Sequence, residues 1–294
     1  MAMIQTKIVL EQLNKLHPQQ EFVVEVRSFS TEGDRTQAEN IPLDQLAGRG
    51  VFVKDLELAL LDGSIDFAVH SLKDMTGDLQ PGLVIAATPV REDPRDVLVS
   101  RGHLPLNALP EGARIGSSSP RRAAQLKTIR PDLRFEPIRG NVDTRVRKVE
   151  QGDYDATLLA AAGLLRLGLA DRIAEYFSPE VCLPDPGQGA LAVEARADDQ
   201  GVLELLAPLN HPETWAAVTA ERALLRALGG GCQVPIAALG EVQGIQLLLQ
   251  GLVASTDDGR LIRSSAQGPI EEAEAIGAEL AQKLRHLGAQ HLLS

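Results

Sequence analysis

The sequence predicts an α/β protein with two α/β lobes and a small α+β domain at the C-terminal end. Over the first two-thirds of the 294 residues, short apolar segments alternate with amphipathic ones, the order typical of parallel sheets with helical crossovers. Two polar, turn-forming stretches, residues 90–96 and 183–189, are suited to cross between two such sheets. Two crossings between two lobes are what a hinged cleft requires.

Apolar periodicity defines the expected elements in chain order. Helical spacing predicts helices over residues 3–16, 51–61, 120–129, 142–151 and 160–167. Alternating or continuous apolar runs predict strands over residues 22–29, 65–69, 83–88, 97–100, 114–116, 133–138, 156–159 and 190–194. The last third differs, with a long helix at 212–228, strands at 236–242, 245–253 and 261–266, and a helix at 270–287. The expected domains are residues 1–89 with 190–207, residues 95–183, and residues 212–294.

Composition excludes several classes of function. Only 3% of the residues are aromatic, too few for stacking platforms on single-stranded nucleic acid. The formal net charge of −11 also disfavours general binding to nucleic acid or acidic membranes. No apolar run approaches the ~20 residues of a membrane span, and no signal peptide is evident. The two cysteines form no CxxC or Cys/His cluster, so we expect no metal, no disulfide framework and a cytoplasmic protein.

Positive charge is concentrated in one stretch of this acidic chain. Residues 114–148 contain ten Lys and Arg against three Asp and Glu, an excess of seven. Solvated helix faces are one explanation. A site for anions is the other, and it is favoured because several of the arginines lie where a predicted strand gives way to a helix.

The first of these junctions is the run Gly-Ser-Ser-Ser-Pro-Arg-Arg at residues 116–122. Ser119 is expected to cap a helix whose first turn tolerates the proline, and the free amides and helix dipole there favour an anion. Arg121 and Arg122 add planar donors suited to carboxylates. A cap without a ligand is the alternative interpretation.

The second junction, residues 139–145, repeats this pattern. A glycine follows the predicted strand, Asn141 is placed to cap the next helix, and Arg145 lies in that helix. Two such helix starts in one lobe predict a ligand that carries several carboxylates.

The other lobe has a polar segment directly after the predicted strand at 65–69. It reads His-Ser-Leu-Lys-Asp over residues 70–74, and ligands of open α/β sheets lie beyond the carboxyl ends of the strands. Asp74 is a candidate carboxylate for a cation that develops during a reaction, with a simple ion pair to Lys73 as the alternative. No partner for His70 is recognisable, so no Ser-His-Asp arrangement is inferred.

Cys232 lies in the run Gly-Gly-Gly-Cys-Gln-Val-Pro, residues 229–235, between a predicted helix and a predicted strand. Three glycines are unfavourable inside either element, so we expect an exposed turn. A cysteine presented there is accessible as a nucleophile or attachment point. Cys182, between Val181 and Leu183, is expected to be a small core residue.

Taken together, these segments resemble the porphobilinogen deaminase, or hydroxymethylbilane synthase, family. The resemblance covers nearly the whole chain and rests on residues 50–54, 70–74, 91–96, 116–122, 139–141, 186–190 and 230–235, in that order and spacing. It implies two lobes like those of periplasmic binding proteins plus a third domain. It also implies a monomeric transferase that joins four porphobilinogen molecules head to tail with loss of ammonia and releases hydroxymethylbilane for tetrapyrrole (haem) biosynthesis.

The resemblance also implies roles for individual residues. A dipyrromethane cofactor would be attached through a thioether to Cys232, and Asp74 would be the catalytic residue that stabilises positively charged pyrrole intermediates and assists proton transfers. The residues implied to bind the cofactor are Cys232, Ser71, Lys73, Asp74, Ser119, Arg121, Arg122 and Arg145. Those implied to bind substrate are Phe52, Arg139, Arg145, Arg166 and Gln188.

Three features depart from the family pattern. The family usually begins with a strand and an Arg-x-Ser-x-Leu-Ala segment, whereas this chain begins Met-Ala-Met, so a first strand and two ligand contacts are expected to be missing. Thr76 replaces a usual proline, and Arg49 replaces a common lysine with its charge kept. The alternative function is a non-catalytic small-anion-binding protein on the same scaffold. A DNA-bound regulator is disfavoured because no helix-turn-helix pattern precedes the lobes.

Overall fold

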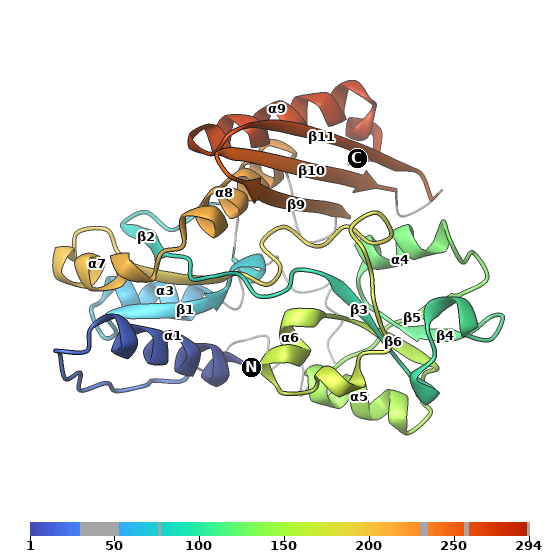
Figure 1. The fold of residues 1–294 in the computed structure, drawn as a ribbon, viewed down its shortest axis with the longest axis horizontal. Coiled ribbons are helices and arrows are strands. Elements are labelled where there is room, and N and C mark those ends of the chain that lie inside the picture. The colour runs from blue at the N-terminus through green and yellow to red at the C-terminus, as the bar shows by residue number, and fades with distance from the viewer. Residues whose placement is uncertain (30–52, 76–77, 230–234, 256–258, 293–294) are drawn as a thin grey trace. The chain divides into compact units, whose positions relative to one another are not determined.

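The structure is a computed structural model that describes residues 1–29, 53–75, 78–229, 235–255 and 259–292. Contacts divide it into two compact units, the first comprising Met1–Arg91 and Ala190–Trp215 and the second Glu92–Gly189 and Ala216–Ser294. The predicted α/β class is confirmed, because helices and three sheets occur among the described residues (Figure 1). The division into three domains stays a prediction.

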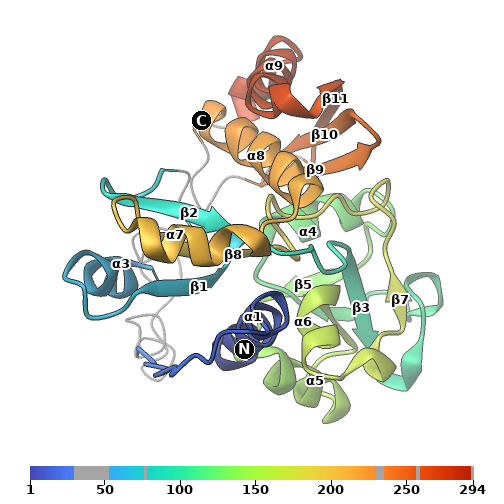
Figure 2. The same cartoon turned by 60° about the vertical axis from the view of Figure 1, so that its left-hand side comes forward.

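The first unit has a three-stranded sheet with helices on both faces. Its elements are α1 (Ala2–Leu16), α3 (Lys54–Leu61), β1 (Phe67–Ser71), β2 (Leu83–Ala87), β8 (Leu191–Arg196) and α7 (Gln200–Leu206). The strand order is β1-β8-β2, with β8 antiparallel to both neighbours. α1 and α7 pack on one face through a cluster that includes Val9, Val193 and Leu206. α3 (Figure 2) packs on the other face, where Leu60 meets Ala68.

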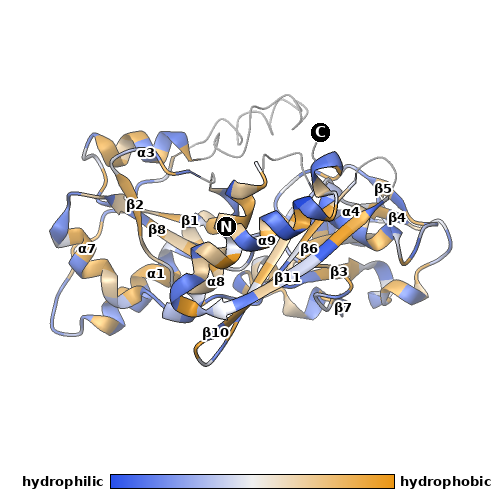
Figure 3. Cartoon of the chain, turned by 90° about the horizontal axis from the view of Figure 1, so that it is seen from above, coloured by the Kyte–Doolittle hydropathy of each residue, from blue (hydrophilic) through white to orange (hydrophobic). Residues whose placement is uncertain are grey.

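The second unit begins with a five-stranded sheet. Its elements are β3 (Asp96–Ser100), β4 (Arg114–Gly116), α4 (Pro120–Lys127), β5 (Arg134–Glu136), α5 (Val142–Glu150), β6 (Ala156–Ala160), α6 (Ala161–Arg166) and β7 (Glu175–Tyr176). The order is β5-β4-β6-β3-β7. Separate buried clusters cover its two faces, because Leu98 and Leu158 point to one side and Val97 and Leu159 to the other. Figure 3 accordingly colours the centres of β3 and β6 as hydrophobic.

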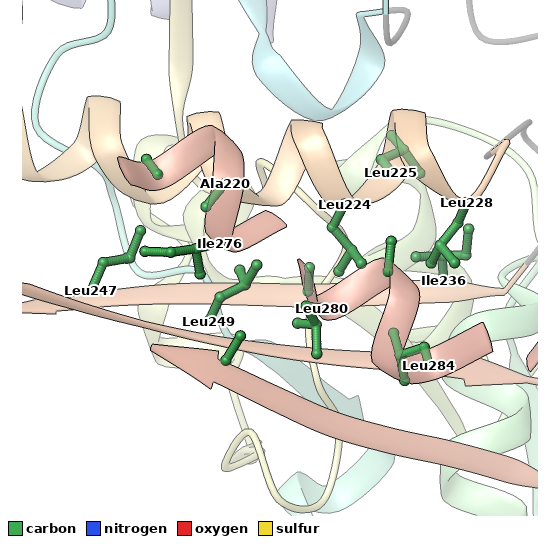
Figure 4. Close-up of a cluster of buried hydrophobic side chains, with 14 of the residues drawn as sticks. Ala220, Leu224, Leu225, Leu228, Ile236, Leu247, Leu249, Ile276, Leu280 and Leu284 are labelled. Atoms are coloured by element: carbon green, nitrogen blue, oxygen red, sulfur yellow. The ribbon is translucent and has the colours of Figure 1, made fainter. Parts of the chain in front are cut away.

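The remainder of the chain forms a small α+β arrangement, as predicted. It consists of α8 (Pro212–Ala227), β9 (Ile236–Gln243), β10 (Gln246–Ala254), β11 (Leu261–Pro269) and α9 (Ala273–His286). The sheet is an antiparallel meander, β11-β10-β9. Leu224 of α8, Leu249 of β10 and Leu280 of α9 are fully buried in one cluster (Figure 4). Each such side chain contributes about 1.5–3 kcal/mol of burial free energy, which holds this part together.

The expectation of parallel sheets is only half right. β4 pairs parallel with β5 and β6, as helical crossovers α4 and α5 require. β3, in contrast, is antiparallel to β6 and β7. A parallel neighbour needs a long crossover, but β3 leads to β4 through short 3-10 turns, so the chain is free to run in the opposite direction.

The strand expected at residues 22–29 is wrong. These residues form no strand in the structure, and Val23 and Val24 are exposed. The alternation of side chains predicts which face each residue would present. It carries no information about whether a neighbouring strand edge is available for pairing.

The two predicted crossing stretches run side by side where they lie in the second unit, from Glu92 in the first stretch and up to Gly189 in the other. The amide of Glu92 donates to the carbonyl of Gly189 at 3.2 Å, and the side-chain amide of Gln188 donates to the carbonyl of Pro94 at 2.7 Å. Gly189 has φ +86°, and a Cβ there would lie 2.3 Å from the Glu92 carbonyl oxygen. Glycine is therefore required for the two segments to approach this closely.

Candidate active site

The segment that carries Asp74 is a short 3-10 turn, Leu72–Asp74, at the carboxyl end of β1. The amide of Leu72 donates to the carbonyl of Ala190 at 3.0 Å, and that of Met75 donates to the carbonyl of Leu72 at 3.1 Å. The Leu72 and Met75 side chains are each 2% exposed. These buried side chains anchor the turn, whereas Asp74 itself is exposed and Lys73 half-buried.

Asp74 lies on the wall of a cavity of about 700 Å³ within the first unit. The cavity is also lined by His70 and Ser71, and its apolar wall includes Val53 and Phe67. Its volume lies within the range of small-molecule sites, ~300–1,000 Å³. A carboxylate beside an apolar wall can stabilise a positive charge more strongly than it could in open water.

Two side-chain contacts hold the end of β1 from its opposite faces. Nε2 of Gln5, on α1, donates to Oγ of Ser71 at 2.7 Å. On the other face, Nε2 of His70 lies 2.9 Å from Oε2 of Glu194, on β8. Glu194 was missed by sequence reasoning, since it lies 124 residues from His70 inside an apolar strand pattern. Its charge within that run is the one signal that could have marked it.

Arg121 and Arg122 are buried around one carboxylate, that of Asp96. Nη1 of Arg121 lies 2.6 Å from Oδ2, and Nη2 of Arg122 lies 2.7 Å from Oδ1. Burial by itself raises the pKa of Asp96, but the two guanidinium charges and the hydrogen bonds from Arg121 and Gln188 outweigh it, so that the pKa lies well below its usual range. For Arg121, burial lowers the pKa, but the nearby negative charges, with Asp96 foremost, outweigh it, so that the pKa is raised overall.

The capping predictions have different outcomes at the two helix starts. Oγ of Ser119 accepts a hydrogen bond from the amide of Arg122 at 3.4 Å at the beginning of α4, so the Ser119 cap is confirmed. Asn141 occupies the cap position of α5, but its side chain makes no capping bond. The backbone of Asn141 is extended, with φ −68° and ψ 171°, and the helix begins after it without a side-chain cap.

Two further arginines are largely buried and form no direct ion pair with a carboxylate among the described residues. Nε of Arg145 donates to the carbonyl of Gly140 at 2.8 Å, and Nη2 of Arg166 donates to the carbonyl of Gly189 at 2.7 Å. Burial lowers the pKa of Arg145, and the neighbouring charge of Arg122 lowers it further. Burial also lowers the pKa of Arg166, opposed by Glu92. Both side chains would therefore be stabilised by a bound anion.

The predicted site residues are distributed over both units. Asp74, Ser71 and Lys73 lie together at the end of β1, in the first unit. Arg122 and Gln188 are brought together in the second unit, where Nη2 of the arginine donates to Oε1 of the amide at 3.4 Å. Arg139 is half-buried at the turn before α5. Cys232 and Phe52 lie outside the described residues.

Neither a metal centre nor a membrane helix emerges from the described part of the chain. Its His, Cys, Asp and Glu side chains form no group of three or more that could hold an ion. No helix in that part combines the length and apolar character needed to cross a bilayer.

The fold and the site define an α/β protein whose second unit carries several buried or half-buried arginines and whose first unit presents an aspartate at a strand end. Comparison with known families makes this specific. Residues 1–204 match the porphobilinogen deaminase dipyromethane cofactor binding domain, and residues 215–286 match the porphobilinogen deaminase C-terminal domain. The chain belongs to the porphobilinogen deaminase family.

Curated relatives agree over the full length. The porphobilinogen deaminase of Syntrophotalea carbinolica is 50% identical over all 294 residues, which span 92% of that protein. That of Roseiflexus sp. is 47% identical over the same residues, 95% of its length. The residues named above for the resemblance are thus parts of one continuous similarity.

Among solved structures, the likeness is distant. The BvgS VFT2 domain (double mutant) of Bordetella pertussis is 17% identical with a TM-score of 0.39, over 69% of this chain and 76% of that chain. The probable amino-acid transporter binding protein ytmK of Bacillus subtilis is 10% identical with a TM-score of 0.38, over 70% and 79%. The family assignment rests on the sequence relatives alone.

Proposed function

We propose that this protein condenses four porphobilinogen molecules stepwise into hydroxymethylbilane, with release of one ammonia per molecule, in tetrapyrrole biosynthesis. Family membership over the whole chain is the observation that carries this proposal. The alternative of a non-catalytic anion-binding protein is not favoured by those relatives. We further propose that the protein acts as a monomer. We also propose that it lies in the cytoplasm, in keeping with its two cysteines and the absence of a disulfide framework in the sequence pattern.

A dipyrromethane cofactor fits the residues that the structure describes. Arg145 and Arg166 are largely buried cations whose pKa values are lowered by burial, and only Arg166 has a nearby carboxylate, that of Glu92, whose charge partly opposes this effect. They would hold acetate or propionate groups, with Arg139 and the Ser119 helix start as further donors. The thioether is assigned to Cys232. When bound, the cofactor supplies the pyrrole carbon to which the first substrate molecule is joined.

Asp74 is assigned the catalytic role. When ammonia leaves porphobilinogen, a positive charge develops on the substrate pyrrole, and the Asp74 carboxylate is placed on the cavity wall to stabilise it. After the carbon–carbon bond forms, the same carboxylate can accept the proton lost from the attacking pyrrole carbon. Arg121 and Arg122 are already bound to Asp96. We assign them the role of attracting the carboxylates of cofactor and substrate through their positive charge. Gln188 orients the guanidinium of Arg122.

Intact mass spectrometry together with an ammonia-release assay tests the function. Protein made in a haem-competent host is expected to carry a dipyrrole-sized adduct that is absent from Cys232→Ser, and to release one ammonia for each porphobilinogen consumed. An unmodified Cys232 contradicts the cofactor assignment. Binding of porphobilinogen without ammonia release decides for the non-catalytic alternative.

A further inference from the structure

A buried pair joins β1 to β8 just before the Asp74 turn. Nε2 of His70 lies 2.9 Å from Oε2 of Glu194, and the two side chains are 5% and 0% exposed. In the antiparallel register, His70 lies opposite Ala192, and Glu194 lies opposite Ala68. The pair therefore links neighbouring strands on the sheet face that α3 covers.

Stability by itself does not account for this pair. Oε1 of Glu194 is buried and has no hydrogen-bond partner among the described residues, although a buried carboxylate is unfavourable unless fully bonded. Apolar side chains of similar size would fill the same space without that desolvation penalty. α3 adds another acidic group, since burial and the nearby Glu194 raise the pKa of Glu57, with His70 opposing.

The location of the pair connects it to the candidate catalytic aspartate. His70 lines the same cavity as Asp74 and is followed directly by Ser71, which Gln5 binds from the opposite face. The amide of Leu72 donates to the carbonyl of Ala190, the residue directly before β8. The strand end is thus fixed by a side chain on each face and by the sheet, and the turn bearing Asp74 continues from it.

We propose that His70 and Glu194 are positioning residues for Asp74: their hydrogen bond fixes the end of β1 and so holds the Asp74 carboxylate where positive charge develops. This proposal rests on the proposed function. A carboxylate stabilises a transition state only when it is held in place beforehand, and a displacement of about 1 Å can cost ~100-fold in rate. Substrate carboxylates are bound by other residues, so kcat should fall while KM changes little.

Glu194→Gln is the test variant, because it keeps the size of the side chain but removes the charged acceptor. Its kcat is expected to fall about 10- to 100-fold, with KM within about twofold of the wild type. In an Asp74→Glu background, the carboxylate is already displaced, so adding Glu194→Gln should lower kcat by less than about threefold. Equal losses in both backgrounds, or a raised KM at constant kcat, would overturn the proposal.

Arg196→Met is the matched control. Arg196 also lies on β8, and its Nη1 donates to the carbonyls of Leu60, in α3, and Ile65, before β1, so its loss loosens the attachment of α3 and the following loop to the same sheet. Its kcat is expected to stay within about twofold of the wild type. A loss as large as that of Glu194→Gln would point to general loosening and contradict the specific role of the pair.

Hydrogen exchange provides a readout that does not depend on turnover. The amides of Leu72 and Met75 are expected to exchange about tenfold faster or more in Glu194→Gln, and at the wild-type rate in Arg196→Met. Unchanged protection in Glu194→Gln overturns the proposal. If the wild-type protein releases no ammonia, the proposed function is refuted. The exchange measurement would still show whether His70 and Glu194 hold the turn that bears Asp74.

Discussion

The carboxylate of Asp96 lies 2.6 Å from Nη1 of Arg121 in the interior of the second unit, and it also binds Arg122 at 2.7 Å. One negative charge is thus the counter-charge of two buried cations. Asp96→Asn is expected to lower the free energy of unfolding by about 3–5 kcal/mol, because both guanidinium groups stay buried without a counter-charge. Urea denaturation measures this loss.

The surface pair Glu150–Arg172 supplies the control for that prediction. Both side chains are 47% exposed, and solvent screens their attraction. Glu150→Gln is expected to cost less than about 1 kcal/mol. If Asp96→Asn unfolds at the same urea concentration as Glu150→Gln, the contacts of Asp96 with Arg121 and Arg122 do not stabilise the folded protein more than a surface ion pair does.

The same cluster predicts how stability depends on pH. The pKa of Asp96 is lowered in the folded protein, so its stabilising contribution is complete above the ordinary carboxyl pKa of about 4 and is lost as pH falls towards the lowered value. The difference in unfolding free energy between wild type and Asp96→Asn should be constant from about pH 5 to 8 and shrink below about pH 4. A difference that grows on acidification contradicts this sign.

Asp74→Ala is expected to separate activity from stability. The residue is exposed on its turn, so unfolding free energy should change by no more than about 0.5 kcal/mol. Ammonia release should fall by at least about 100-fold, while the mass adduct on Cys232 remains. Retained wild-type turnover would remove Asp74 from the catalytic role.

Arg145→Gln is expected to weaken binding without a loss of stability. The buried guanidinium already has its pKa lowered by burial and by Arg122, so replacing it relieves an unfavourable charge. KM for porphobilinogen should rise about tenfold or more, the value of a charged hydrogen bond. Arg147→Gln, an exposed change on the same helix, should leave KM unaltered, and an equal rise there contradicts a specific site at Arg145.

Cys182 is expected to be unreactive in the folded protein. Burial and, to a smaller extent, the charge of Asp96 together raise the pKa of this thiol to about 12, so the nucleophilic thiolate is scarce at pH 8. Iodoacetamide followed by peptide mass mapping should find Cys182 unlabelled until denaturant is added. Labelling of the native protein at the rate of a free thiol would show that the site is accessible.

Much of the architecture follows from local pattern. The helical periods at residues 120–129 and 142–151 appear as α4 and α5, and the C-terminal strands and helix appear nearly as expected. These predictions succeed because apolar spacing records which face of an element is buried. The strand at residues 22–29 failed because its formation depends on a partner edge, which no local pattern contains.

For the candidate site, too, some features follow from the sequence and others only from the tertiary structure. The sequence by itself determined the aspartate-bearing turn after a strand, the Ser119 helix start, the concentration of arginines and, through ordered motifs, the family. Only the tertiary structure decided what each charge contacts: Arg121 and Arg122 bind Asp96, Arg145 has no described carboxylate, and His70 finds Glu194. The reason is physical. Charge pairing depends on distances of a few ångströms between residues that can lie far apart in the sequence, such as His70 and Glu194, 124 positions apart, and those distances exist only once the sheets have formed.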